Sequence, residues 1–383
     1  MTRTRRATVA MLLVGLAIFS SLYSTQAILP TLVHNMGLSS TEAAMTVSAA
    51  TGALALCVVP ASILSERFGR GRILLISAVA ATGVGLIVPF AQEGWQLIVV
   101  RGLQGALLSG APATAMAWLS EELDDKALPR AMGLYIAGTS VGGLTGRLIP
   151  TGLVEISTWR WALFGSALVS LAFAITAWLL LPTQRNFRPK SIHLKTESRA
   201  LLGHWANRDL ALLFLTAFLS MGTFVSMYNF LTFRLIDDFG LAPSLAGLAF
   251  LFYLTGTWSS ARAGSLVARI GHGKTLFASA VLFALGIAFC AGNLPLTLLG
   301  MIAFTVGFFA VHSTASGWVG QIATHDRAEA SSMYVFCYYF GSSVVGACAG
   351  LLFDALSWPL FIAFFTAVAL ALTALTWTKI KSD

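Results

Sequence analysis

Twelve apolar runs, separated by short polar segments, follow one another along the chain. A helix needs about 20 predominantly apolar residues to cross a bilayer, and each run reaches roughly that length. Backbone polar groups inside a bilayer are satisfied only in helices or closed barrels, so the pattern predicts an all-α membrane protein with twelve transmembrane helices. The predicted spans lie near residues 7–30, 42–63, 73–91, 96–119, 130–153, 160–181, 209–233, 244–266, 275–292, 295–318, 329–352 and 359–378.

The longest polar segment divides these runs into two sets of six. It extends over residues 182–208 and is rich in Lys and Arg, whereas every other loop is short. We therefore predict an N-terminal six-helix bundle over residues 1–181, a cytoplasmic central loop over 182–208, and a C-terminal six-helix bundle over 209–383.

The two halves contain a repeated loop. Residues 62–72 and 264–274 both follow the plan small-x-x-x-x-Arg-x-Gly-x-Gly-basic, and each joins the second and third runs of its half. Two weaker matches have nearly the same spacing: residues 19–23 resemble 224–228, and residues 134–142 resemble 333–341. Such duplication is typical of membrane transporters. It predicts two pseudo-symmetric bundles with the substrate path between them.

Composition agrees with a membrane protein, because 57% of the residues are hydrophobic and only 10% are charged. A soluble domain carries about a quarter charged residues. The four cysteines, Cys57, Cys290, Cys337 and Cys348, lie within apolar runs and lack metal-ligand spacing. We interpret them as small packing residues, and expect no metal or cofactor.

The net charge of +8 is explained by topology. With a cytoplasmic amino terminus, the Lys and Arg residues all lie on the cytoplasmic side except Arg160 and Arg234 at the outer surface and Arg101 and Arg147 within spans. This positive-inside distribution predicts that both termini are cytoplasmic. The basic charge therefore does not indicate binding to nucleic acid.

The first run is preceded by three arginines, as in a signal peptide. Its apolar stretch is too long for one, and no small-x-small cleavage site follows. We expect this run to remain in the protein as the first span.

Three motifs resemble signatures of the major facilitator superfamily. The loop at 62–72 resembles G-x-x-x-D-R-x-G-R-R-x, with Ser62 in place of the glycine and Glu66 in place of the aspartate. Arg101-x-x-Gln104-Gly105 in span 4 is similar to R-x-x-Q-G. Span 5 contains Gly138-x-x-x-Gly142-Gly143-x-x-Gly146-Arg147, which resembles the exporter motif G-x-x-x-G-P-x-x-G-G. Gly143 replaces its proline, and Arg147 replaces its last glycine.

The resemblance covers essentially the whole chain and implies the major facilitator fold. Its span-5 motif implies the branch of twelve-span drug/proton antiporter-like exporters. A member of that branch is expected to be a proton-coupled exporter of the bacterial inner membrane that works as a monomer by alternating access.

The resemblance also implies conformational roles. Glu66, Arg67 and Arg70 are expected to form a latch, in which the Glu66 carboxylate accepts hydrogen bonds at a facing helix start. The alternative is a simple charge cluster that sets topology. Gly142, Gly143 and Gly146 are expected to take part in gating, or only to let two helices pack closely. Arg147 is expected to be an outer gate or a charge that captures the substrate.

Ionisable residues within spans are the best indication of substrate. Arg101, Arg147 and His312 lie in spans, whereas no acidic residue lies in the middle of one. Such residues usually face a water-filled cavity, so the cavity is predicted to be positive and to favour an anionic or zwitterionic substrate. Alternatively, Arg147 extends outward to an acid at the outer surface, Glu42, Asp237 or Asp238.

Proton coupling requires an ionisable group within a span, and we assign this role to His312 and Arg101; His312 is the one that would change charge near neutral pH. A hydrogen bond between helices is the alternative role for His312. Polar and aromatic residues complete the predicted binding site, namely Tyr23, Gln26, Tyr228, Asn229 and Tyr338. Each of these could instead be a packing residue.

An enzyme and a sensor or scaffold are the alternatives from other classes of protein. His204 and Asp209 spell H-x-x-x-x-D, a pattern seen in acyltransferases, but nothing else supports an enzyme. A sensor or scaffold would not need motifs of both bundles together with buried charge. Multidrug efflux and flipping of a lipid-like amphiphile remain the alternative transport functions.

Overall fold

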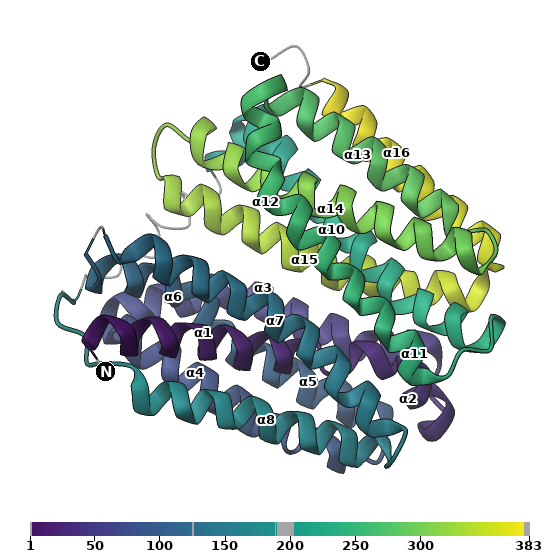
Figure 1. Ribbon diagram of the computed structural model, residues 1–383, viewed down its shortest axis with the longest axis horizontal. Coiled ribbons are helices and arrows are strands. Elements are labelled where there is room, and N and C mark those ends of the chain that lie inside the picture. The colour runs from purple at the N-terminus through teal and green to yellow at the C-terminus, as the bar shows by residue number, and fades with distance from the viewer. Residues whose placement is uncertain (1, 125, 188, 190–202, 379–383) are drawn as a thin grey trace. The chain divides into compact units, whose positions relative to one another are not determined.

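The computed structural model describes residues 2–124, 126–187, 189 and 203–378, and these residues form helices joined by short loops (Figure 1). The chain divides into two compact units, Met1–Ile192 and His193–Asp383. Most of the predicted central loop, with its basic residues Lys190, Lys195 and Arg199, lies outside the described residues. The predicted bundle limits at 181 and 209 stay a prediction.

In the first unit, α1 packs against α7 and α8, and α3 packs against α5. Its elements are α1 (Arg3–Leu22), η1 (Gln26–Ile28), α2 (Leu29–Met36), α3 (Ser40–Phe68), α4 (Arg70–Gly85), η2 (Val88–Phe90), α5 (Gly94–Leu108), α6 (Gly110–Glu122), α7 (Leu128–Val154) and α8 (Trp159–Leu180).

In the second unit, α10 packs against α15, and α13 packs against α14 and α16. Its elements are η3 (His204–Ala206), α10 (Arg208–Phe233), the π-helical turn η4 (Arg234–Asp238), α11 (Pro243–Leu248), η5 (Ala249–Phe252), α12 (Tyr253–Ile270), α13 (His272–Phe289), α14 (Leu294–Ile322), α15 (Arg327–Ala355) and α16 (Trp358–Trp377).

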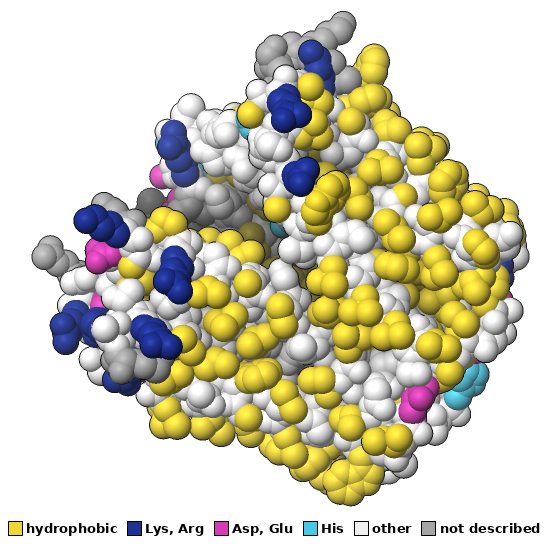
Figure 2. Space-filling view, viewed as in Figure 1, with side chains coloured by type: hydrophobic (Ala, Val, Ile, Leu, Met, Phe, Trp, Pro, Cys, Tyr) yellow, Lys and Arg dark blue, Asp and Glu magenta, His cyan; other side chains and the backbone are white. Residues whose placement is uncertain are grey.

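The prediction of an all-α protein with twelve spans is confirmed. Within the described residues, nine helical segments are long and apolar enough to cross a membrane. The other three predicted spans coincide with α5 and α6, with the glycine-rich α7, and with α11, η5 and α12. Large apolar side chains lie exposed on the surface of each unit, as expected for lipid-facing helices, and in the first unit Lys and Arg gather near the start of α1 (Figure 2).

The repeated loop has one structure in both units. Gly69 ends α3 with a φ of 101°, and Gly271 ends α12 with a φ of 86°. Residues with a side chain rarely adopt these angles, so each hairpin requires glycine at this position. The sequence repeat therefore reflects a repeated backbone requirement.

Glycines also allow close helix crossings in each unit, and one such crossing recurs in both units. A Cβ atom at Gly138 would collide with the carbonyl oxygen of Leu12, where α7 crosses α1. A Cβ atom at Gly341 would collide in the same way with Phe218, where α15 crosses α10. Gly142, which the offset between the halves pairs with Gly341, lies against the α1 backbone at Leu16. Packing within each unit thus explains these glycines, and their role in gating stays a prediction.

We predict that Gly138→Ala lowers the free energy of unfolding by about 1–3 kcal/mol, because the new methyl group forces α1 and α7 apart. Gly133→Ala on the same helix is the matched control, since a Cβ atom there meets nothing within 4 Å. It should leave stability unchanged or slightly higher. Thermal unfolding in detergent distinguishes the two, and equal effects would contradict the crossing as the cause.

Candidate functional site

The first span is interrupted inside the first unit. Helix α1 ends at Leu22, and the chain continues through the short turn η1 into α2. Pro30, at the start of α2, has no N–H to donate to the carbonyl four residues earlier, which disfavours a continuous helix here. A helix that ends leaves its last four carbonyl groups without intrahelical partners, so buried acceptors remain at the break.

Arg101 on α5 supplies the donors for these acceptors. Its Nη1 donates to the Ser21 carbonyl at 2.9 Å, and its Nη2 donates to the Leu22 carbonyl. The positive guanidinium also lies at the negative end of the α1 dipole, where a cation is stabilised. Arg101 therefore caps a helix that is 79 residues distant in the sequence.

The remaining contacts of Arg101 join α3 and the neighbouring Gln104 of α5 to this cap. Its Nε donates to the Thr46 carbonyl of α3 at 3.1 Å, and Nη1 also donates to Gln104 Oε1 at 2.5 Å. Gln104 in turn donates from Nε2 to Ser21 Oγ at 2.7 Å. The R-x-x-Q spacing places both side chains on one face of α5, where they hold the end of α1 together.

Arg101 is fully buried, and four of its five N–H groups donate to neutral protein acceptors. In this conformation it contributes a buried charge and a structural cap. The substrate contact predicted for it stays a prediction, because nearly all its donors are already engaged.

Arg147 lies on the other side of the break. Its Nε donates to Gln26 Oε1 at 2.8 Å, and its guanidinium carbon lies 4.0 Å from the centroid of the Tyr23 ring. The structure thus brings together Tyr23, Gln26 and Arg147, three residues that sequence analysis assigned to the site or its gate. Arg147 is only 2% exposed.

The two departures from the exporter motif depend on each other. Arg147 folds back along α7 and donates from Nη1 to the Gly143 carbonyl at 2.6 Å. A Cβ atom at position 143 would lie 3.2 Å from that same Nη1. A proline at 143 would therefore crowd the guanidinium, and glycine leaves room for it.

In the second unit, the counterpart of the Tyr23 region is an aromatic cluster. Phe224 stacks on Phe308 with ring centroids 3.9 Å apart, and Tyr228 shares a hydrogen bond of 2.8 Å with Thr305. Tyr228 and Asn229 are 1% and 0% exposed. They form part of the interior of this unit, and the substrate contact predicted for them stays a prediction.

His312 lies at the edge of this cluster and is partly exposed. The Tyr334 hydroxyl group lies 3.1 Å from His312 Nδ1 and 3.3 Å from the His312 carbonyl, and the tautomer of the ring decides which of the two accepts its hydrogen. In the tautomer with the proton on Nδ1, the hydroxyl group accepts from Nδ1 and donates to the carbonyl. Nε2 has no hydrogen-bond partner in the described part of the chain and is available to accept a proton. The Tyr338 ring, also partly exposed, lies 4.7 Å from the His312 ring.

The predicted latch residues form an ion-pair network at the α3–α4 hairpin. Arg70 contacts Glu66 at 3.2 Å and Glu121 at 2.5 Å. Arg67 lies beside the Phe68 ring instead. Sequence analysis missed Glu121, although it begins the acidic pair that ends span 4. Contact of Glu66 with a facing helix start stays a prediction.

Known proteins resemble this chain in sequence and in fold. The sequence profile of the Major Facilitator Superfamily matches residues 11–250 and 212–382. The inner membrane transport protein YnfM of Escherichia coli is 36% identical over 98% of this chain and 90% of its own length. The uncharacterized MFS-type transporter YybF of Bacillus subtilis is 35% identical over 92% of this chain and 88% of its own. The crystal structure of the nucleoside transporter NupG (D323A mutant) superposes with a TM-score of 0.82 at 13% identity, covering 98% of this chain and 99% of that one.

We predict that Arg101→Lys destabilises the protein by about 2–4 kcal/mol, because one ammonium group cannot replace the fork that binds α1, α3 and Gln104 together. Thermal unfolding in detergent measures the change. Arg160→Lys is the control, since Arg160 is partly exposed and donates to a single carbonyl, that of Ala91, at 3.0 Å. A small effect at Arg101, similar to that at Arg160, would contradict the capping role.

Proposed function

Since the chain belongs to the major facilitator superfamily and is a multi-pass membrane transporter, we propose that it carries a small organic anion or zwitterion by alternating access. The proposed location is the bacterial inner membrane, and the proposed working unit is a monomer, as is usual in the family. The observation that carries the substrate class is the pair of buried guanidinium groups that flank the break in the first span.

The electrostatics of the first unit support this substrate class. Arg101 has only neutral acceptors, so the carbonyl groups and the α1 dipole offset its charge only in part. The described acidic residues of this unit lie at helix ends or in loops and not in the middle of a helix. A charge in a low-dielectric interior acts over a long distance. An anion can therefore be attracted without direct contact with either arginine.

Names of more distant relatives point to two kinds of substrate. One, from Cupriavidus pinatubonensis, is named "Probable 4-methylmuconolactone transporter" and is 27% identical over 74% of this chain. Another, from Proteus mirabilis, is multidrug resistance protein MdtG, at 28% identity over 76% of this chain. The second name keeps multidrug efflux as the alternative function, which the aromatic cluster around Phe224 and Phe308 would suit.

Proton-coupled export is the mechanism that we propose. Nε2 of His312 is the proposed proton acceptor, in the tautomer in which Nδ1 donates to Tyr334. The direction rests on the resemblance of span 5 to the exporter motif. In this mechanism, protonation of His312 alternates with substrate binding.

A ligand screen tests the substrate class. We expect anionic or zwitterionic solutes to raise the unfolding temperature of the purified protein, because a ligand stabilises the state that binds it. Arg147→Gln should weaken this binding about tenfold or more, equivalent to about 1.4 kcal/mol or more, while Arg147→Lys retains the charge and part of the affinity. Arg160→Gln, which removes a charge far from the break in sequence, is the control. Stabilisation by lipophilic cations, unaffected by Arg147→Gln, would instead favour multidrug efflux.

Transport in proteoliposomes tests the proton acceptor. We expect His312→Gln to abolish the dependence of transport on an imposed pH gradient, because glutamine cannot be protonated in this range. Tyr334→Phe keeps Nε2 and removes only the partner of Nδ1, so it should shift the pH profile and retain coupling. Unchanged coupling in His312→Gln would show that the histidine is structural.

A further inference from the structure

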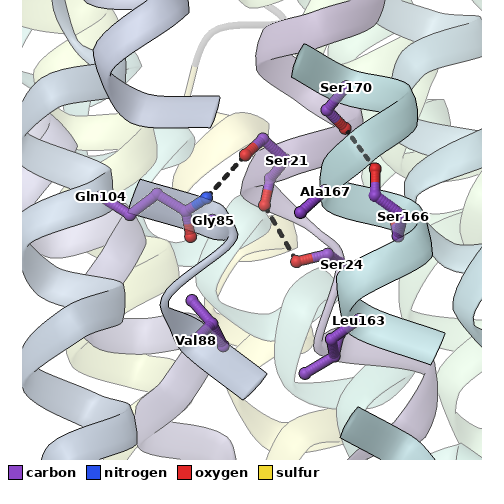
Figure 3. Close-up of a pocket in the computed structure, with 9 residues that line it drawn as sticks. All are labelled: Ser21, Ser24, Gly85, Val88, Gln104, Leu163, Ser166, Ala167 and Ser170. Atoms are coloured by element: carbon purple, nitrogen blue, oxygen red, sulfur yellow. Dashed lines mark hydrogen bonds between the residues drawn. The ribbon is translucent and has the colours of Figure 1, made fainter. Parts of the chain in front are cut away.

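A small internal cavity lies in the first unit beside the end of α1. The volume open to the centre of a water molecule is about 10 Å³, which is room for about one water. Four serines and a glutamine supply its polar lining (Figure 3). The lining residues are Ser21, Ser24, Gly85, Val88, Gln104, Leu163, Ser166, Ala167 and Ser170.

Ser166 on α8 presents an unsatisfied hydroxyl group to this cavity. Ser166 is 1% exposed, and its Oγ has no hydrogen-bond partner among the residues that the structure describes. The neighbouring Ser170 does not satisfy it, because Ser170 Oγ bonds to Ser20 Oγ at 2.5 Å and to the Ser166 carbonyl at 3.0 Å. A buried hydroxyl group without a partner is costly, and buried polar groups are nearly always satisfied by protein or by water.

The facing wall retains hydrogen-bonding capacity as well. Ser21 Oγ accepts from Gln104 Nε2 at 2.7 Å, which leaves its own hydrogen available. Ser24 Oγ donates to the Ser21 carbonyl at 3.1 Å, so its lone pairs are available. A guest between these walls can therefore find donors and acceptors on both α1 and α8, as a buried water requires.

We propose that this cavity is a binding site for one structural water molecule, which joins Ser166 of α8 to Ser21 and Ser24 of α1. A cation does not suit the site, because Gln104 connects it directly to the positive Arg101. Organic solutes are too large for it. The water extends the network that caps the broken helix, from Arg101 through Gln104 and Ser21 to α8.

Two measurements test this site. A structure at about 2 Å resolution should show density for one water within hydrogen-bonding distance of Ser166 Oγ. Thermal unfolding of Ser166→Ala supplies an independent test through the sign of its effect. If water satisfies the hydroxyl, its removal should lower the unfolding temperature by about 1–3 °C. If the hydroxyl is truly unsatisfied, its removal should leave that temperature unchanged or raise it.

Ser342→Ala on α15 is the matched control. Ser342 is 0% exposed, its Oγ likewise has no partner within the described ranges, and it is not among the residues that line this cavity. Ser166→Ala should have a lower unfolding temperature than this control. Equal or higher stability of Ser166→Ala, or a well-ordered cavity wall without water density, would overturn it.

Discussion

A broken helix inside a membrane protein requires donors for its free carbonyl groups, and the arrangement of the first unit depends on how that requirement is met. Arg101 meets it from α5, with hydrogen bonds to the last carbonyl groups of α1 and to α3. In a medium that offers no water, these acceptors would otherwise be costly to bury. The guanidinium is suited to this task because its planar fork can serve several acceptors at once.

This cap gives a physical meaning to the R-x-x-Q motif that differs from direct substrate recognition. The glutamine and the arginine act together on one helix end, and the charge remains in the protein interior after its donors are used. A substrate can respond to that charge through the electrostatic field. Arg147 is likewise buried on the other side of the break, where it donates to the Gln26 side chain and lies over the face of the Tyr23 ring.

The two units share a backbone plan, but their chemistry differs. Both have a glycine hairpin, at Gly69 and Gly271, and both have a helix crossing that excludes side chains. The first unit places buried charge at its interrupted helix, whereas the second fills the corresponding region with stacked aromatic rings and one histidine. Duplication therefore preserved what the helices need in order to pack, and allowed the side chains near the site to diverge.

The sequence by itself determined the twelve helices, the two similar halves and the glycine hairpins, because hydropathy and positive φ angles are requirements that act locally. It also drew attention to Arg101, Arg147 and His312, since charge within an apolar run is visible without a structure. Only the tertiary structure decided which groups these side chains contact. A buried guanidinium can face water or unpaired carbonyl groups, and the carbonyls that Arg101 binds lie 55 to 80 residues away in the sequence. Helix packing brings those acceptors to it, and no local pattern encodes that approach.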